Sequence, residues 1–173
     1  VVKLRLCQGL LKSDRFEFVV QKATELGVHS IQAIVTRRSI ADSPSIHKAS
    51  RWSRIAKEAA ELAGRVWVPH ILPAKTLESA VAGRNGPSIT LWEGERKVSL
   101  QEAVENIAGN LTTNLSLFIG PEGGFEVDEA EFMDTSGSAL ASFGKRILRA
   151  DTAGVAAVAL VMYEVGDLGI RLF

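Results

Sequence analysis

The sequence predicts an α/β fold with an open, mostly parallel sheet and helices on both of its faces. Segments with a strand pattern alternate with segments of helical periodicity along all 173 residues, as in proteins built from strand–helix–strand units. One internal segment, 115–119, is a compact and largely apolar run, which is typical of a buried parallel strand. With 46% hydrophobic residues the chain can form one substantial core. We therefore expect a single domain over 1–173.

The elements of the first half follow from periodicity and from helix-ending residues. Alternating apolar and polar residues indicate strands, recurrence at helical spacing indicates helices, and Gly27 and Gly64 close two of those helices. Pro69 and Pro73 bracket one short strand, which weakens that strand prediction. The expected elements are a strand at 1–7, a helix at about 16–26, a strand at 30–36, a helix at about 48–63, a strand at 68–72 and a short helix near 77–82.

The second half continues the alternation. Asp128 and Glu129 are placed well for the N-terminal end of a helix, where acidic residues are stabilised. The last helix is almost wholly apolar, and Asp151 or Thr152 is expected to cap its start. The expected elements are a strand at 88–92, a helix at 100–107, a strand at 115–119, a helix at 127–133, a strand at 139–143 and a helix at 153–163.

Composition narrows the class of protein. Lys+Arg and Asp+Glu both number 20, so the net charge is zero and any nucleic-acid binding must come from local basic clusters. The single cysteine, Cys7, cannot form an intramolecular disulfide. No apolar run reaches the roughly 20 residues that span a bilayer, so we expect a cytoplasmic protein without membrane contact. The histidines are scattered without cysteine or carboxylate at metal-ligand spacing, and we predict no metal site.

Three predicted strand ends carry unusual residues, and ligands of open α/β sheets collect at such ends. The first is Gly120–Gly124, in which three glycines and a proline form a tight loop with Glu122 as its only charged side chain. It lacks the Gly-Lys-Ser/Thr of a phosphate-binding loop and the GxGxxG of a dinucleotide site. Taken alone, the loop fits a tight turn and a ligand cradle equally well.

The other two strand ends are a basic loop and an acidic one. In the segment 144–152, Lys145, Arg146 and Arg149 precede the last helix, either as solvated charges or as part of a site. The position of this loop at a strand end favours a site. Glu93, after the strand at 88–92, could accept hydrogen bonds from a ribose or a base, although an exposed loop carboxylate is the simpler interpretation.

Several arginines are candidates for phosphate contact. Two follow the second strand, three lie on the helix at 48–63 or its exit, and one lies in the basic loop. Ion pairing is the competing interpretation, because Glu58 shares a helix face with two of them. The candidates for RNA binding are Arg37, Arg38, Arg51, Arg54, Arg65 and Arg146.

Four sequence blocks resemble the RsmE family of bacterial 16S ribosomal RNA uridine N3-methyltransferases, which belong to the SPOUT superfamily. The blocks occur in family order and span nearly the whole chain. They read QKATELGV at 21–28, EAA at 58–60 followed by Gly64-Arg65, IGPEGGF at 119–125, and RILR at 146–149 ahead of Thr152-Ala153. Two departures from the family pattern are Leu62, where glutamine is common, and Asp151, where glutamate is common.

The resemblance implies a C-terminal trefoil knot, a homodimer, and ribosomal RNA or the small ribosomal subunit as substrate. It also implies a small N-terminal β-barrel domain that this chain does not include, which agrees with a chain that opens on Val1. S-adenosylmethionine is the implied cofactor. Its expected contacts are Leu91, Ile119, Gly120, Gly124, Phe143, Gly144, Ile147 and Leu148.

Methylation of uridine N3 requires loss of a weakly acidic imide proton and stabilisation of the resulting anion. We expect Arg149 to stabilise this anion or an adjacent phosphate, and Glu122 or Asp151 to act as the base or to orient the substrate. Alternatives are methylation of another RNA or base atom and a cofactor-free RNA-binding assembly factor. We also expect the chain alone to bind cofactor but to methylate RNA poorly.

Overall fold

The computed structural model describes residues 2–12, 14–39, 44–108, 113–165 and 168. Helices and strands alternate from one end of the chain to the other, as predicted. The elements are β1 (Lys3–Gly9), α1 (Arg15–Glu25), β2 (Ser30–Val35), α2 (Ile46–Leu62), β3 (His70–Thr76), α3 (Leu77–Ala82), β4 (Ser88–Leu91), α4 (Leu100–Ala108), β5 (Asn114–Ile119), α5 (Val127–Thr135), β6 (Ser138–Ala141) and α6 (Ala150–Glu164).

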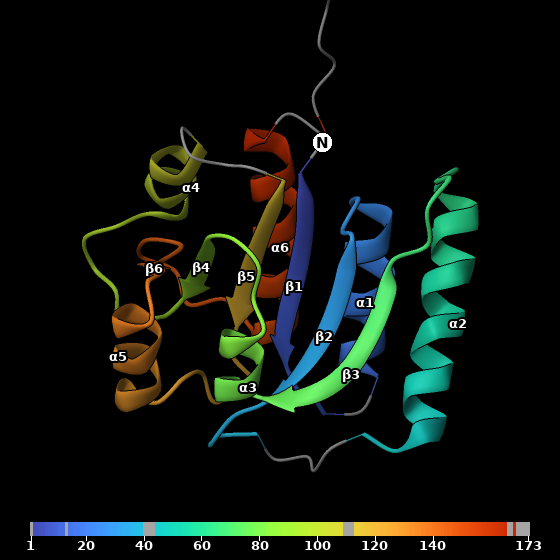
Figure 1. Cartoon of the computed structure of the whole chain (residues 1–173), viewed down its shortest axis with the longest axis horizontal. Helices are drawn as coiled ribbons and strands as arrows, with labels where there is room; N and C mark the ends of the chain where they lie inside the picture. The colour runs from blue at the N-terminus through green and yellow to red at the C-terminus, as the bar shows by residue number, and fades with distance from the viewer. Residues whose placement is uncertain (1, 13, 40–43, 109–112, 166–167, 169–173) are drawn as a thin grey trace, which may run out of the picture.

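The strands form one six-stranded sheet in the order β3-β2-β1-β5-β4-β6 (Figure 1). Every pair is parallel, which confirms the predicted α/β class and makes the sheet fully rather than mostly parallel. The chain builds outward from β1 through β2 to β3 and then continues on the other side of β1. The strand order therefore reverses between β1 and β5, and such a reversal is where α/β sheets bind ligands.

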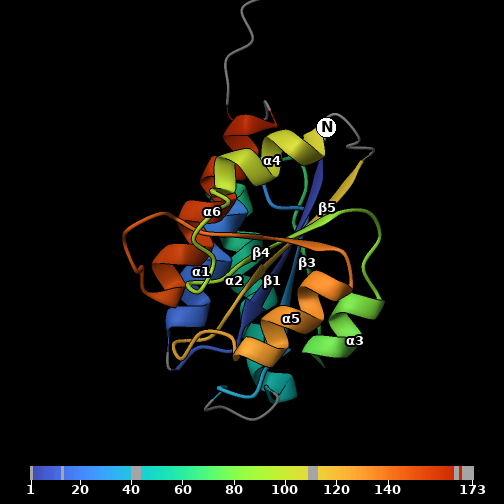
Figure 2. The same ribbon diagram turned by 90° about the vertical axis from the view of Figure 1, so that its left-hand side faces the viewer.

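Helices cover both faces of the sheet, as predicted (Figure 2). Helices α1, α2, α4 and α6 form one layer, in which α1 packs against both α2 and α6. Helices α3 and α5 lie on the other face. The larger core cluster fills the first layer and includes Leu4, Leu6, Phe16 and Val158. The smaller one lies under α3 and α5 and includes Phe118.

The predicted strand at 68–72 begins too early. Strand β3 starts at His70, whose N–H donates to the His29 carbonyl at 3.2 Å. Pro69 has no N–H to offer a neighbouring strand, so the ladder starts one residue later. Pro73 lies inside β3, where the register with β2 shifts, and an edge strand tolerates this.

The prediction that Asp151 or Thr152 caps the last helix is wrong. Helix α6 starts at Ala150, and the capping residue is Arg149, whose carbonyl accepts from the Ala153 N–H at 2.7 Å. The extended backbone of Arg149 already ends the preceding loop, so both predicted caps lie in the first helical turn. Within the ranges that the structure describes, no helix combines the length and apolar character that a membrane span requires.

Candidate active site

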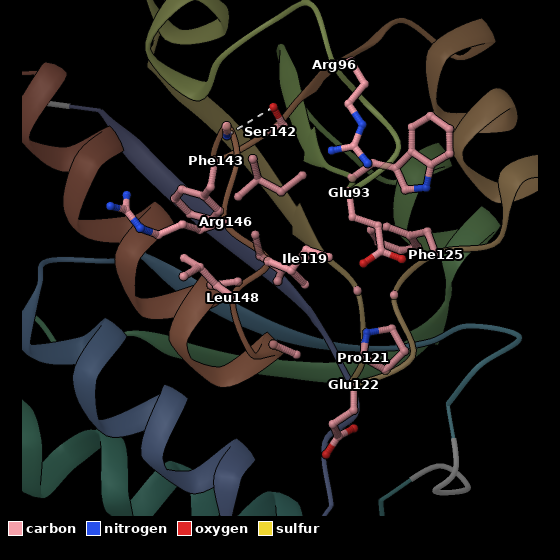
Figure 3. A pocket seen from close by; sticks show the side chains of 18 residues that line it. Glu93, Arg96, Ile119, Pro121, Glu122, Phe125, Ser142, Phe143, Arg146 and Leu148 are labelled. Carbon is pink, nitrogen blue, oxygen red and sulfur yellow. Dashed lines mark hydrogen bonds between the residues drawn. The ribbon is translucent and has the colours of Figure 1, made fainter.

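A cavity of about 740 Å³, including its open side, lies at the carboxyl ends of β4, β5 and β6 (Figure 3). Its walls are the glycine loop after β5, the turn after β4 and the basic loop between β6 and α6. The structure brings together here all eight residues that the sequence predicted to contact a cofactor. They are Leu91, Ile119, Gly120, Gly124, Phe143, Gly144, Ile147 and Leu148.

The glycine loop is folded tightly on itself. The Gly124 N–H donates to the Pro121 carbonyl at 2.9 Å, and Gly124 has a φ of +70°, which favours glycine. A Cβ on Gly120 would lie 3.0 Å from the carbonyl carbon of Gly124. The end of β1 is equally close, because a Cβ on Gly9 would lie 2.3 Å from the Pro121 nitrogen. These glycines let three stretches of backbone meet at the floor of the cavity.

Gln8 joins β1 to this loop. Its side chain is fully buried, and its Nε2 donates to the Gly120 carbonyl at 3.1 Å and to the Gly9 carbonyl at 3.4 Å. A Cβ on Gly154 of α6 would lie 2.4 Å from Gln8 Oε1. Gln8 therefore fixes the direction of the Gly120 carbonyl, and Gly154 gives α6 room to pack against it.

The three predicted catalytic residues do not gather in one place. Glu122 lines the cavity, but its Oε1 accepts from the Lys12 N–H at 2.9 Å and lies 3.6 Å from Arg15 Nη1. Figure 3 shows its carboxylate directed away from the other labelled side chains. Arg149 and Asp151 do not line the cavity. They form an ion pair of 3.5 Å at the start of α6, where the Arg149 side chain is 64% exposed and that of Asp151 only 15%.

Glu93 at the third strand end lines the cavity. Its Oε1 lies 3.5 Å from the position that a Cβ on Gly124 would take, and Figure 3 shows the carboxylate pointing toward Phe125. Trp92 and Arg96 from the same turn complete this wall. The turn thus places one acidic acceptor directly over the glycine loop.

Arg38 holds the glycine loop from the side of β2. Its Nη1 donates to the Gly123 carbonyl at 2.7 Å, while Nε and Nη2 bind both carboxylate oxygens of Glu126 at 2.8 and 2.9 Å. This guanidinium lowers the pKa of Glu126, and the carboxylate in turn raises the pKa of Arg38. Glu126 also forms a capping box with Glu129 at the start of α5. Arg38 thus has a structural partner as well as a predicted RNA contact.

The other arginines predicted to bind RNA also have protein partners. Arg37 pairs with Asp128, Arg51 with Glu17 at 2.8 Å, and Arg54 with Glu58 at 3.8 Å. The Arg65 guanidinium donates to three carbonyls at the end of α1 and the turn that follows, the shortest bond being 2.6 Å to Thr24. Arg146 differs from this group because it lines the cavity. Their contact with RNA stays a prediction.

The part of the chain that the structure describes offers no metal-binding cluster of histidine, cysteine and carboxylate side chains. Across the described ranges, no three of them are grouped so that they could hold a metal ion. Cys7 is buried under α3 and α5, and burial raises the pKa of its thiol to about 12. Such a thiol stays protonated at neutral pH and is a poor nucleophile.

Comparison with known proteins identifies the family. Residues 1–162 match the model of the RNA methyltransferase domain. The chain belongs to this family. Two curated relatives are named ribosomal RNA small subunit methyltransferase E, which confirms the resemblance to the RsmE family. The one from Bacillus subtilis is 31% identical over 94% of this chain and 66% of its own length. The one from Synechocystis is 35% identical over 90% and 52%.

Solved structures agree with this assignment. A ribosomal RNA small subunit methyltransferase E from Neisseria gonorrhoeae, bound to S-adenosyl methionine, has a TM-score of 0.83 and 28% identity over 97% of this chain and 68% of its own. A putative methyltransferase from Legionella pneumophila, in complex with the same cofactor, has a TM-score of 0.84 and 28% identity over 94% and 66%. The chain spans about half to two thirds of the curated relatives' length.

Sequence reasoning missed several residues that support the cavity. Gln8, Gly9 and Gly154 shape the floor of the cavity, and Arg38 braces its loop. A polar residue followed by glycine at the end of the first predicted strand was the available signal for Gln8 and Gly9. Gly154 offered a signal too, because it interrupts the apolar sequence of the last helix.

Proposed function

We propose that the chain is an S-adenosylmethionine-dependent methyltransferase that methylates N3 of a uridine in 16S ribosomal RNA. One observation carries the proposal: the eight residues chosen for the cofactor line a single cavity at the switch point of the sheet. Membership of the RNA methyltransferase family supports the reaction class. The named relatives support small-subunit ribosomal RNA as the substrate. Such a substrate would place the protein in the cytoplasm.

The cavity fits the proposed cofactor. It is lined mainly by apolar side chains and backbone with a few polar groups, as small-molecule sites are. Leu91, Ile119 and Leu148 offer apolar contacts for an adenine ring, while Glu93 offers a carboxylate for ribose hydroxyls. The glycine loop brings backbone groups close to a ligand without interference from side chains. When bound, the cofactor supplies an electrophilic methyl group.

The start of α6 is the proposed catalytic element. Asp151 is mostly buried and paired with Arg149, so its carboxylate is held in one place. We assign Asp151 rather than Glu122 as the acceptor of the N3 proton, because the Glu122 carboxylate points away from the other side chains of the cavity, toward Lys12 and Arg15. Arg149, whose side chain is more exposed, would stabilise the negative charge that deprotonation leaves on the uracil ring.

Arg149→Ala tests this assignment. Loss of the cation should slow methylation of small-subunit RNA roughly 100-fold or more, since charge stabilisation in a transition state contributes that much. The measurement is transfer of a radiolabelled methyl group with the protein in excess, with a reverse-transcription stop to identify N3. Lys57→Ala is the control, because Lys57 forms an exposed intrahelical pair with Glu61 and is not among the predicted site residues. A folded Arg149→Ala protein with the wild-type rate would contradict the assignment.

We infer three further properties of the whole chain. Residues 1–173 act as one catalytic domain.

The C-terminal part forms a trefoil knot. The path of the chain supports this inference, because it runs from β6 at the sheet edge back to α6, which packs on α1 and β1 near the centre. The chain dimerises through α1 and α6, where Phe18, Leu160 and Tyr163 are exposed. A monomer mass in sedimentation equilibrium would exclude the dimer, and an experimental chain trace without a threaded loop would exclude the knot.

A further inference from the structure

An exposed group of aromatic rings lies at the amino ends of the strands, opposite the cavity. The Trp67 indole stacks on His29 with ring centroids 5.4 Å apart and an interplanar angle of 7°. His70 meets Trp67 edge-on at 5.1 Å. His29 precedes β2, His70 begins β3, and Trp67 lies in the link between α2 and β3. That link is at the upper right of Figure 1, whereas the strands end at the bottom.

Trp67 is not part of a core. Its side chain is 45% exposed, and its neighbours Val66 and Val68 are also exposed. His29 covers one side of the indole, so the exposed remainder can accept another flat ring. Three successive apolar side chains in solvent are costly in an isolated protein and mark a surface that binds a partner.

The surroundings of this group are cationic. The pKa of His29 is lowered first by partial burial and then by the charges of Lys3, His70 and Arg65. No carboxylate is among the causes of this lowered pKa, so the surroundings favour the neutral form of the imidazole. Aromatic rings beside positive charges suit a nucleic-acid strand, because a base can stack on a ring while a neighbouring phosphate meets the charge.

A hollow next to the rings adds hydrogen-bond donors. Lys3 and His29 border both the rings and the hollow, which Arg5, Asn85 and Asn114 also line. Arg5 donates to the Gly83 carbonyl and to Gln32, and its buried Nε–H has no hydrogen-bond partner in the structure. None of the described residues that line this hollow is acidic. The hollow therefore suits an anionic group such as a phosphate.

We propose that Trp67, His29, Lys3 and the adjoining hollow form a binding surface for single-stranded RNA, with a base stacked on Trp67 and a backbone phosphate near Lys3 and Arg5. The choice of RNA over DNA rests on the proposed function. The surface gives a chain of zero net charge a local RNA contact, whereas four arginines predicted for that role pair with carboxylates. The surface lies at the amino ends of the strands, whereas the cavity lies at their carboxyl ends. It would therefore bind a part of the RNA that is distant from the nucleotide to be methylated.

Anisotropy of a fluorescein-labelled single-stranded RNA of about eight nucleotides tests the proposal, since this length lies within known site sizes. Trp67→Ala should weaken binding roughly 5- to 100-fold, the effect of removing one stacking platform. Trp67→Phe keeps an aromatic ring and should retain most of the affinity. Ile46→Ala, which also removes an exposed apolar side chain but at the start of α2, is the control and should bind as the wild type does. Lys3→Ala should reduce the slope of log affinity against log salt by about 0.7, as for one lost phosphate contact.

Three outcomes would overturn the proposal: Trp67→Ala that binds this RNA as tightly as the wild type, an equal loss in Ile46→Ala, and a change in self-association without a change in RNA affinity. Thermal unfolding of each variant shows whether it is folded, and Trp67→Phe keeps the test valid if Trp67→Ala is not. Calorimetry with S-adenosylmethionine separates the two hypotheses. RNA binding that depends on Trp67 without cofactor binding would sustain this surface and refute the proposed function.

Discussion

At the scale of single residues, the shape of the cavity depends on glycines. Gly9, Gly120 and Gly154 each lie where a Cβ would meet another part of the structure, and Gln8 connects the first two through its hydrogen bonds. Backbone from β1 and the glycine loop can converge because Gly9 and Gly120 carry no side chain, and Gly154 leaves room beside α6 for the Gln8 side chain. The residues that touch the cofactor in our proposal are therefore supported by residues that do not.

Gly9→Ala should damage the cavity more than its size suggests. The new methyl group would be 2.3 Å from the Pro121 nitrogen, so the backbone must shift, at a cost of about 1–3 kcal/mol or more. We expect S-adenosylmethionine affinity to fall about tenfold or further, a change of about 1.4 kcal/mol in binding. Calorimetry measures the affinity and thermal unfolding the stability.

Gly64→Ala is the control for Gly9→Ala. Gly64 has a φ of +64° but nothing within 4 Å of its missing Cβ. Alanine there should cost about 1–2 kcal/mol of stability through backbone strain alone, with unchanged cofactor affinity. Equal affinity losses in both variants would show that general destabilisation, and not the contact with Pro121, is the cause.

The sequence marks the loops that line the cavity, whereas the binding of a cofactor by their residues stays a prediction. The glycine loop and the basic loop carry unusual residues at strand ends, and all eight cofactor positions line the cavity. Prediction could not place Glu122, because its partners Lys12 and Arg15 come from the other side of the strand-order reversal. Contacts between segments more than 100 residues apart leave no local pattern in the chain.

At the scale of elements, α5 is tied to the site through its first turn. Arg38, which follows β2, grips both Glu126 and the Gly123 carbonyl, so the start of α5 and the glycine loop move together. Acidic residues at this helix start were predicted from the sequence. The arginine that binds them was predicted only as an RNA contact, since its distance in sequence concealed the pairing.

The paired Glu126 gives stability a defined pH dependence. Its pKa is lowered in the folded chain, chiefly by Arg38, from about 4.3 when unfolded. The ionised Glu126 carboxylate therefore stabilises the folded state fully at pH values above its unfolded pKa. This stabilisation is lost as the pH falls through the pKa of Glu126 in the folded chain. Glu126→Gln should lower the unfolding temperature at pH 7 and lose less on acidification from pH 5 to 3. Scanning calorimetry across this range measures both effects.

Glu131→Gln is the control for this pH dependence, because Glu131 is exposed on the same helix. It should follow the wild-type curve. A Glu126→Gln protein that loses as much stability between pH 5 and 3 as the wild type would show that the Arg38 pair does not contribute.

Element boundaries show the limits of periodicity. The sequence predicted every helix and strand in order, but it began β3 at 68 rather than at His70 and α6 at 153 rather than at Ala150. Pro69 and the extended Arg149 decide these starts through backbone hydrogen bonding. The pattern of side chains carries no information about such bonds, so hydrophobic spacing alone misplaces the first residue of β3 and of α6.

At the scale of the whole molecule, the parallel sheet separates two surfaces. Its carboxyl ends carry the cavity, and its amino ends carry Trp67, His29 and the adjoining cationic hollow. The alternation of strands and helices predicted a parallel sheet. Each helix returns the chain to the amino end of the sheet, so that the next strand runs in the same direction. The order β3-β2-β1-β5-β4-β6 was not predictable from this alternation, since strand order is decided by packing between distant segments.

Titration calorimetry with S-adenosylmethionine tests the central claim most directly. The account predicts heat from one site per chain, competition by the demethylated cofactor, and loss of binding in Gly120→Val, whose side chain would meet the Gly124 backbone at 3.0 Å. A folded wild-type chain that shows no binding heat across a range of temperatures, and no competition, would contradict the assignment of the cavity as a cofactor site.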